Sequence, residues 1–278
     1  YAIIAAVDNI GLNKKFVVTV GGTYSVAPLY GWKWACLLRW AYKRADLITA
    51  ISNYTKKAIL SRVASLKISI INPGIDLIRF YKPHQFSGEK FILSVGALKF
   101  RKGYHVSIPA FALFKKKFPD FNYMIIGSQT DERYFNELKD MINDLNINSS
   151  VKFMSGILDD DLSNLYSKAS AFILTSVNKD FNFEGFGLVF LEAAAAGLPV
   201  VGTTGNGIED AVKNGFNGIL VPQNDIQKTA EALTEVVSTE EATRKFSQNG
   251  YDWSNQHSIK KMADEYAESY KKILNNET

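Results

Sequence analysis

Two glutamates stand on either side of a glycine-rich junction in the second half of the chain. Glu184 comes directly before Gly185, and Glu192 follows Gly187 and an apolar run. Glycine frees the backbone here, so we expect a helix to begin near Gly187 with unpaired N–H groups in its first turn. Such a helix start attracts phosphate, and neighbouring carboxylates accept hydrogen bonds from sugar hydroxyls. The alternative interpretation is a capped core helix with two solvated acids.

Three cations closely follow an apolar strand pattern. Lys99, Arg101 and Lys102 lie in a turn bounded by Gly96 and Gly103, just before an amphipathic helix pattern. Ligands of an open α/β sheet bind beyond the carboxyl ends of its strands, so we expect these side chains to reach the ligand crevice. Arginine offers a planar fork and lysine a mobile point charge, and together they suit a diphosphate. A solvated basic turn is the alternative.

Short apolar runs and longer amphipathic segments alternate along nearly the whole chain. This rhythm is typical of parallel strands joined by crossover helices, so the sequence predicts an α/β fold. The expected strands are 16–20, 47–50, 68–71, 91–95, 123–126, 151–153, 171–174, 199–201 and 218–221. The expected helices are 32–44, 53–61, 104–118, 132–145, 162–168, 187–196, 208–212, 227–238 and 258–274.

A polar stretch with proline and glycine interrupts the apolar periodicity around residues 83–90. We therefore predict a partial first domain at 1–82, a linker at 83–90 and a second domain at 91–250 with a complete doubly wound pattern. The final segment, 251–278, is expected to return to the first domain because nothing after it continues the sheet. Because Tyr1 opens the sequence inside an apolar segment, we also expect the natural protein to start earlier.

Composition excludes several classes of protein. The 278 residues contain one cysteine, Cys36, and three widely spaced histidines, which excludes an internal disulfide and a local metal motif. No apolar stretch approaches the roughly 20 residues that span a bilayer, and no secretion signal is visible, so we expect a cytoplasmic protein. Residues 1–90 carry 13 Lys and Arg against 4 Asp and Glu, whereas residues 91–278 carry 19 against 24. The basic first part predicts an anionic partner there.

Four motifs, in this order, resemble those of the family 4 retaining glycosyltransferases. They are Ala45-Asp46-Leu47 through Ser52, Asn72-Pro73-Gly74-Ile75-Asp76, the turn Val95-Gly96-x-Leu98-x-x-Arg101-Lys102-Gly103, and Glu184 and Glu192 in E-x7-E spacing. The match runs over nearly the whole chain. It implies a GT-B fold, in which two Rossmann-like domains face a cleft. The second domain would bind a nucleotide-sugar donor and the first, here incomplete, the acceptor.

The resemblance also implies roles for particular residues. Arg101 and Lys102 match the cations that stabilise the leaving diphosphate, and Glu184 matches the acid that faces the donor sugar. These three are the predicted catalytic residues. Glu192 matches the acid that binds the ribose hydroxyls. The other predicted donor-binding residues are Phe186, Gly187, Leu188, Gly96, Gly127, Gly156 and Thr203.

The implied reaction needs neither a metal nor a protein nucleophile. In glycosyl transfer, negative charge grows on the departing diphosphate, so cations and a helix start belong beside it. An oxygen of that diphosphate can take the acceptor proton on the same face, as the retaining family implies. The resemblance therefore implies transfer of a hexose-type sugar from a nucleotide-diphosphate donor to a glycan or lipid-linked acceptor, without a cofactor.

Two positions depart from the family pattern. The predicted acceptor side is Gly21, Gly22 and Thr23, and the family often has a histidine where Gly21 stands. Many members also have arginine at the position of Ala97, and we expect Arg101 to replace it. The alternative function is a noncatalytic sugar-nucleotide-binding module or an inactive fragment of such an enzyme.

Three further segments bear on cofactors and partners. Asp159–Asp161 opens a helical pattern, where acids favour the helix dipole, so we assign it no metal. Gly202–Gly207 does not read GxGxxG, which argues against a nicotinamide cofactor. Trp32–Arg44 combines tryptophan and leucine with lysine and arginine, which is typical of a peripheral contact with an inner membrane surface. A helix packed into its own domain is the alternative, and nucleic acid is not expected because no reading module accompanies the charge.

Overall fold

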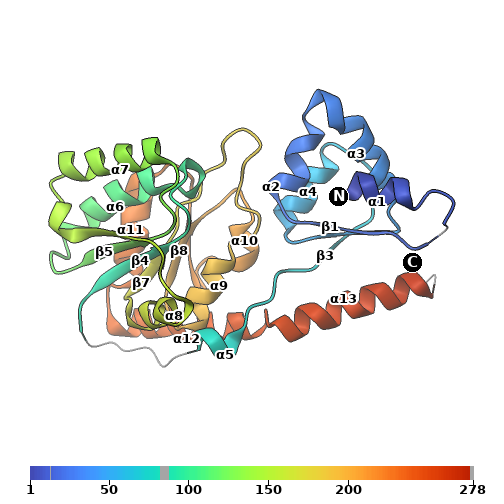
Figure 1. Ribbon diagram of the computed structural model, residues 1–278. Helices are drawn as coiled ribbons and strands as arrows, with labels where there is room; N and C mark the ends of the chain where they lie inside the picture. Colours follow the sequence, from blue (N-terminus) through green and yellow to red (C-terminus); the bar gives the residue numbers. More distant parts are fainter. Residues whose placement is uncertain (13, 82–87, 276–278) are drawn as a thin grey trace.

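The computed structural model describes residues 1–12, 14–81 and 88–275 (Figure 1). Among these residues, a first parallel sheet has three strands in the order β1-β2-β3, and a second has six in the order β6-β5-β4-β7-β8-β9. Each sheet contributes to a hydrophobic core cluster of its own. The α/β prediction is therefore confirmed, and we call the two units the first and the second domain.

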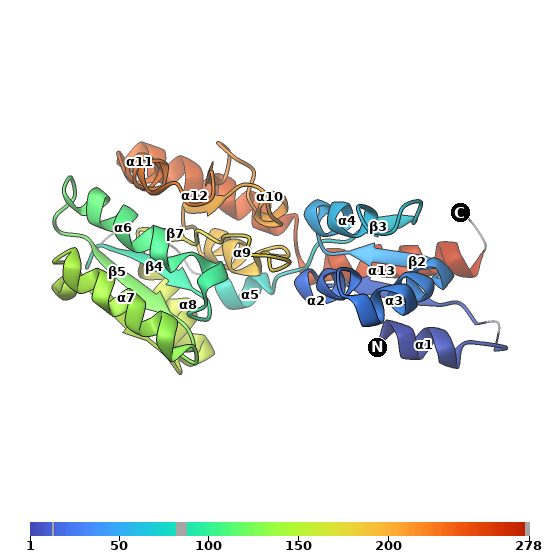
Figure 2. The same ribbon diagram turned by 90° about the horizontal axis from the view of Figure 1, so that it is seen from above.

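The first domain surrounds its short sheet with helices. Its strands are β1 (Val17–Val20), β2 (Leu47–Ala50) and β3 (Ile68–Ile70). Its helices are α1 (Ala2–Asp8), α2 (Thr23–Val26), a 3-10 turn at Ala27–Leu29, α3 (Trp32–Arg44) and α4 (Asn53–Leu60). Figures 1 and 2 show α3 and α4 on one face of this sheet and α13 (Ile259–Leu274) on the other.

The second domain is doubly wound, with helices on both faces of the sheet. Its strands are β4 (Phe91–Val95), β5 (Asn122–Ile126), β6 (Val151–Met154), β7 (Ala171–Ile173), β8 (Val200–Thr203) and β9 (Gly218–Val221). Its helices are α5 (Leu77–Phe80), α6 (Tyr104–Lys115), α7 (Glu132–Asp144), α8 (Asp159–Lys168), α9 (Leu188–Ala195), α10 (Ile208–Ala211), α11 (Ile226–Val236) and α12 (Glu240–Asn255), with 3-10 turns at Phe100–Lys102 and Asn148–Ser150. In Figure 1, α6 and α7 lie above the sheet and α8 and α9 below it. Because both faces are covered, β7 and β8 are buried along their whole length.

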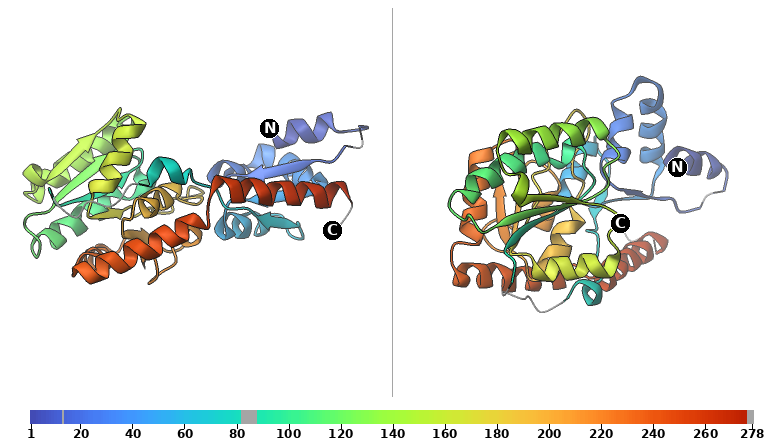
Figure 3. Two further views of the ribbon diagram at one scale, coloured as in Figure 1. Left: turned by 90° about the horizontal axis from the view of Figure 1, so that it is seen from below. Right: turned by 60° about the vertical axis from the view of Figure 1, so that its left-hand side comes forward.

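The chain passes between the domains twice, near Ile75 and near Ser258, and these two segments lie side by side. Ile75 pairs with Ser258 in a parallel bridge, and its N–H donates to the backbone oxygen of His257 at 2.8 Å. Glycine is required beside this bridge, since a Cβ on Gly74 would lie 2.6 Å from the Cα of Ile259. After the second crossing, α13 runs alongside the first domain (Figure 3).

The predicted boundary between 250 and 251 falls inside α12. Gly250 packs on α9, where its Cβ position is 3.4 Å from the Cβ of Ala194, and Trp253 Nε1 donates to the backbone oxygen of Ala211 at 2.9 Å. These contacts keep α12 on the second domain up to its last turn. The return to the first domain therefore begins at Ser258, later than the sequence predicted.

All nine expected strands are present, with ends within two residues of the prediction. Within the described residues, four helices were not expected, namely α1, α2, α5 and α12. The four-residue helices α2 and α5 are too short for a 3.6-residue periodicity to show, and α12 buries only Phe246, Gly250 and Ser254. Residues 82–87, most of the predicted linker, lie outside the described residues, so that linker stays a prediction. Across the described residues, no helix has the length and apolarity that a membrane crossing requires.

Candidate active site

The two predicted catalytic cations contact the predicted catalytic acid. Nζ of Lys102 donates to Oε2 of Glu184 at 2.6 Å, and Nη1 of Arg101 donates to the same oxygen at 3.2 Å. The Glu184 and Lys102 side chains are 12% and 11% exposed, whereas that of Arg101 is 34% exposed. These charge-assisted hydrogen bonds bring the three residues together in one site. Arg101 is the member that a ligand reaches most easily.

A close approach of two backbones fixes the turn that carries both cations. The 3-10 turn at Phe100–Lys102 ends at Gly103, whose φ is 75°. A Cβ on Gly103 would lie 1.7 Å from the backbone oxygen of Thr175, so only glycine fits. Thr175 follows β7, and its Oγ1 donates to the backbone oxygen of Gly103 at 2.6 Å. Ser176, the next residue, donates from Oγ to Oε2 of Glu184 at 3.4 Å. The segment after β7 thus holds the turn and also contacts the acid.

Glu192 has a different partner from Glu184. Its Oε2, on α9, accepts a hydrogen bond from Oη of Tyr166 on α8 at 2.9 Å. Burial raises the pKa of the Glu192 carboxyl, although the Tyr166 hydrogen bond and the positive charge of Arg79 act in the opposite direction. Tyr166 is fully buried, and burial raises its own pKa well above the ordinary value. Sequence reasoning missed Tyr166, because a tyrosine on an amphipathic helix is usually part of the core.

Helix α9 begins at the glycines, as the sequence predicted. Gly187 precedes its first residue with a φ of 84°, and no side chain caps the helix. The first N–H groups of a helix lack intrahelical partners, and here they form the positive end of the helix dipole. Leu188 is exposed, whereas Phe186 is buried in the core of the second domain. A ligand would therefore meet the backbone at Gly187 and Leu188 rather than the Phe186 ring.

The remaining predicted donor-binding residues lie in different surroundings. A Cβ on Gly127 would lie 1.9 Å from the backbone oxygen of Gly96, so these glycines pack against each other after β5 and β4. Gly156 has a φ of 67° and open space around its Cβ position. Thr203 is fully buried, and its Oγ1 donates to the backbone oxygen of Ser176 at 2.6 Å. Their contact with a donor stays a prediction, and the Thr203 hydroxyl already has a partner in the protein.

The loop that carries Glu184 docks on the first domain. Oγ1 of Thr23 donates to the backbone oxygen of Phe183 and accepts from its N–H, both at 3.1 Å. The Phe183 ring is buried within the core cluster of the first domain. A Cβ on Gly22 would lie only 3.1 Å from the Cα of Gly185. Two of the predicted acceptor-side residues thus contact the residues on either side of Glu184.

Gly21, the third acceptor-side residue, lies at the end of β1. Its N–H donates to Oγ of Ser25 at 3.1 Å, and, apart from its neighbours in the chain, no described residue has an atom within 4 Å of its Cβ position. The space is therefore open at the position where the family often has a histidine.

The carboxylate of Asp210 accepts hydrogen bonds across the border between the domains. Oδ2 of Asp210, on α10, accepts from the backbone N and the Nδ2 of Asn53 at 2.7 and 3.1 Å, and from Nδ2 of Asn72 at 3.3 Å. Asn53 opens α4, so the contact ties the start of that helix to the second domain. Sequence reasoning missed it, because Asp210 and Asn53 are ordinary polar residues 157 positions apart.

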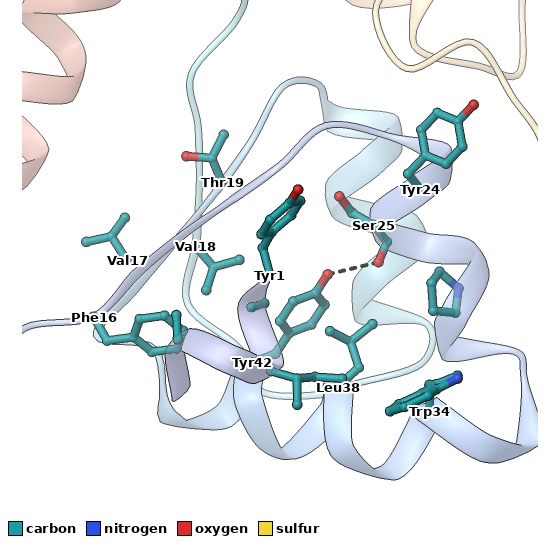
Figure 4. Close-up of a pocket in the computed structure, with 14 residues that line it drawn as sticks. Tyr1, Phe16, Val17, Val18, Thr19, Tyr24, Ser25, Trp34, Leu38 and Tyr42 are labelled. Atoms are coloured by element: carbon teal, nitrogen blue, oxygen red, sulfur yellow. Dashed lines mark hydrogen bonds between the residues drawn. The ribbon is translucent and has the colours of Figure 1, made fainter. Parts of the chain in front are cut away.

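The first domain also contains an apolar pocket of about 550 Å³, bordered by α1, β1, α2 and α3 (Figure 4). Val18 and Leu38 are among the residues that line it. Oη of Tyr42 donates to the backbone oxygen of Ser25 at its edge, at 2.9 Å. None of the predicted catalytic or donor-binding residues is among the lining residues. The candidate active site is therefore separate from this pocket.

The described residues contain no group of three or more His, Cys, Asp or Glu side chains that could hold a metal ion. Asp159–Asp161 forms the first turn of α8, as expected of acids near a helix start. Asp159 pairs with Arg79 of α5 at 2.6 Å.

Two family models and a curated relative match this chain. Residues 79–253 match the family model described as "Glycosyl transferases group 1", and residues 1–79 match "Glycosyltransferase Family 4". A putative colanic acid biosynthesis glycosyltransferase, WcaL of Salmonella typhimurium, is 30% identical over 198 residues, which are 70% of this chain and 48% of that protein.

Two solved structures share the fold. Sucrose-phosphate synthase from Thermosynechococcus elongatus aligns with a TM-score of 0.83 at 20% identity, over 99% of this chain and 72% of its own. HepE of Anabaena in complex with UDP aligns with a TM-score of 0.84 at 20% identity, over 97% of this chain and 76% of its own. The chain spans about half the length of its curated relative WcaL. Because the group 1 model covers more than half of the chain, the protein belongs to the family 4, group 1 glycosyltransferases, and its fold is GT-B.

Proposed function

We propose that the protein binds a nucleotide-diphosphate sugar and transfers its hexose to a glycan or lipid-linked acceptor with retention of anomeric configuration. The contact of Glu184 with Lys102 and Arg101 carries this proposal. It places two cations and an acid at the border between the domains, where a donor and an acceptor would meet. Family membership and the UDP complex of the fold neighbour HepE support a nucleotide-sugar donor.

The charges of the site suit the breaking of a sugar–phosphate bond. As the C1–O bond lengthens, negative charge grows on the diphosphate, and Arg101 with Lys102 would stabilise it together with the start of α9. Glu184 would face the sugar, on which positive charge develops. An oxygen of the leaving diphosphate would accept the proton of the acceptor hydroxyl, so the proposal includes neither a metal nor a covalent intermediate.

Glu192 would hold the nucleoside part of the donor. A carboxylate accepts hydrogen bonds from two vicinal hydroxyls, and Tyr166 holds this one in place through its own hydroxyl at 2.9 Å. The ribose would then lie beside α9, with its diphosphate directed toward the helix start.

A donor screen tests this function. UDP-, GDP- and ADP-sugars are incubated with the protein and a set of glycan and lipid-linked acceptors, and released nucleoside diphosphate is measured with and without EDTA. We expect release from one donor, unchanged by EDTA, and a loss of about 100-fold in Lys102→Gln. The anomeric configuration of the product is then read by NMR. Release that depends on added metal, or an inverted product, contradicts the proposal.

A noncatalytic sugar-nucleotide-binding module is the second candidate. The open space at Gly21 favours it, because no side chain there can act on the acceptor. In that case the protein binds a nucleoside diphosphate but releases none from any sugar donor. Donor turnover that Arg101→Ala removes excludes this candidate.

We further propose that the enzyme works at an inner membrane surface, through the exposed side of α3. Trp32, Trp34 and Leu37 are 93%, 60% and 44% exposed, and exposed Lys43 and Arg44 add positive charge. Tryptophan and cations together suit an interface with anionic lipids. We expect co-sedimentation with phosphatidylglycerol vesicles that falls with added salt and in Lys43→Glu plus Arg44→Glu. Co-sedimentation insensitive to both changes contradicts this contact.

A further inference from the structure

A second pocket of the first domain is basic. Its volume is about 530 Å³, and it lies between α3 and the loop that follows α4. Arg39 and Lys43, one helical turn apart on α3, border it on one side, and Arg62 with residues 63–66 borders it on the other. We call Arg39, Lys43 and Arg62 the basic pocket. None of its residues belongs to the candidate active site or to the apolar pocket of Figure 4.

The charges of the basic pocket are not balanced within the described part of the protein. None of the ion pairs found among those residues includes Arg39, Lys43 or Arg62. Nε of Arg39 is buried and has no hydrogen-bond partner there. A buried donor without an acceptor costs free energy, so the guanidinium of Arg39 keeps hydrogen-bonding capacity that these residues do not use. Arg101 and Lys102 differ, because each already contacts Glu184.

Two features hold the basic pocket in shape before any ligand enters. The guanidinium carbon of Arg62 lies 3.6 Å from the centroid of the Tyr30 ring, a close cation–π contact. Ser65, in the loop, has a φ of 64°, a left-handed conformation that is uncommon outside glycine and is found at ligand sites. The Tyr30 ring also stacks on Phe181 at 4.0 Å, three residues before Glu184. The position of Arg62 is therefore set by packing that reaches the Glu184 loop.

We propose that the basic pocket binds a phosphate group. A phosphate carries nearly two negative charges and several acceptor oxygens. It therefore suits a site with two planar guanidinium groups and one ammonium group better than a carboxylate does. The volume leaves room for a group larger than the phosphate itself. The site is distinct from the diphosphate site of the proposed function, since its residues lie in the other domain.

Calorimetry with inorganic pyrophosphate tests the site. The titrations use the Arg101→Gln plus Lys102→Gln variant, so that the donor site does not contribute to the signal. We expect saturable binding that weakens about tenfold or more when Arg39→Gln and Arg62→Gln are added. Lys57→Gln plus Lys67→Gln, which removes two exposed charges from the same region, is the matched control and leaves binding unchanged. Absence of saturable binding, or equal weakening in the control, overturns the proposal.

Two more measurements keep the outcome clear. Arg62→Lys keeps the positive charge, so we expect it to bind pyrophosphate more tightly than Arg62→Gln does. The melting temperature of each variant shows whether it is folded. Vesicles of phosphatidic acid in phosphatidylcholine distinguish the source of the phosphate. Pyrophosphate displaces the protein from them if a lipid headgroup enters the basic pocket, and not if the ligand is a soluble phosphate. The affinity of the donor site for its nucleoside diphosphate stays as in the wild type in Arg39→Gln plus Arg62→Gln, so failure of this site and failure of the donor site are told apart.

Discussion

Lys102 and Glu184 are 82 residues apart in sequence, yet Nζ of the lysine lies 2.6 Å from Oε2 of the glutamate. The lysine comes from the turn after β4, and the glutamate from the loop before α9 that docks on the first domain. This pair therefore joins the cationic turn to the border between the domains. The Glu184 carboxylate is hydrogen-bonded to the same two cations that would bind a donor diphosphate.

Glu184→Gln removes that internal anion while keeping the shape of the side chain. We expect the variant to bind nucleoside diphosphate at least as tightly as the wild type, because Lys102 and Arg101 no longer neutralise a carboxylate. Sugar transfer should fall about 100-fold or more, since the charge that faces the sugar is lost. Calorimetry and product release measure the two effects. Affinity about tenfold weaker than wild type would show that Glu184 only holds the cations in place.

We expect Glu192→Gln to make the protein more stable but to weaken its binding of nucleoside diphosphate. Burial raises the pKa of this carboxyl above its ordinary value of 4.5, so the folded protein retains the proton that the unfolded chain has already lost. The wild type therefore loses stability as pH rises between these two pKa values, and the neutral glutamine avoids that loss.

At neutral pH we expect a higher melting temperature for Glu192→Gln and nucleoside diphosphate binding weakened about tenfold or more, because hydrogen bonds to a charged acceptor are lost. Wild-type binding should also weaken as pH falls through the raised pKa. The exposed Glu231→Gln serves as the control. If Glu192→Gln binds nucleoside diphosphate as tightly as the wild type does, Glu192 does not bind the ribose.

Thr23→Val tests whether the first domain positions Glu184. Valine keeps the shape of threonine but loses the hydroxyl that both donates to and accepts from Phe183. We expect kcat to fall about tenfold with little change in nucleoside diphosphate affinity, because the cations and α9 stay in place. Amide hydrogen exchange should become faster in residues 179–186. Thr23→Ser retains the hydroxyl and should behave as wild type, so equal exchange rates in all three proteins would refute the positioning role.

Asp210→Ala removes the acceptor that ties Asn53 and Asn72 to the second domain. We expect the contact between the domains to weaken by about 2 kcal/mol, since three donors lose a charged partner. Small-angle scattering should show a larger radius of gyration, and the melting temperature should fall. The neighbouring exposed Glu209→Ala is the control. Identical scattering from Asp210→Ala and the wild type would mean that other contacts hold the domains together.

The sequence predicted the elements more completely than the contacts between them. Strands and long helices follow from local periodicity, and Gly103 and Gly187 mark two of the junctions at which the chain has a left-handed residue. α12 was not predicted because few of its residues are buried. The start of the segment that returns to the first domain was misplaced because it depends on the packing of α12 against α9.

The same division holds for the site. Charge and glycine marked the segments that carry Arg101, Lys102 and Glu184, and the resemblance to the family implied the roles of these three residues. Tyr166 and the role of Thr23 were not, since each depends on a partner far away in sequence. Thr203 shows the reverse, because it is the last residue of β8 and the protein itself uses its hydroxyl.

The most direct test of the account is a titration with UDP, GDP and ADP, comparing the wild type with Arg101→Gln plus Lys102→Gln. The account predicts that the wild type binds one of these three diphosphates more tightly than the other two. It also predicts that the folded double variant binds it about 100-fold or more weakly, because two charge-assisted contacts are lost. Equal affinity in the two proteins, or no binding of any diphosphate by the wild type, would contradict it.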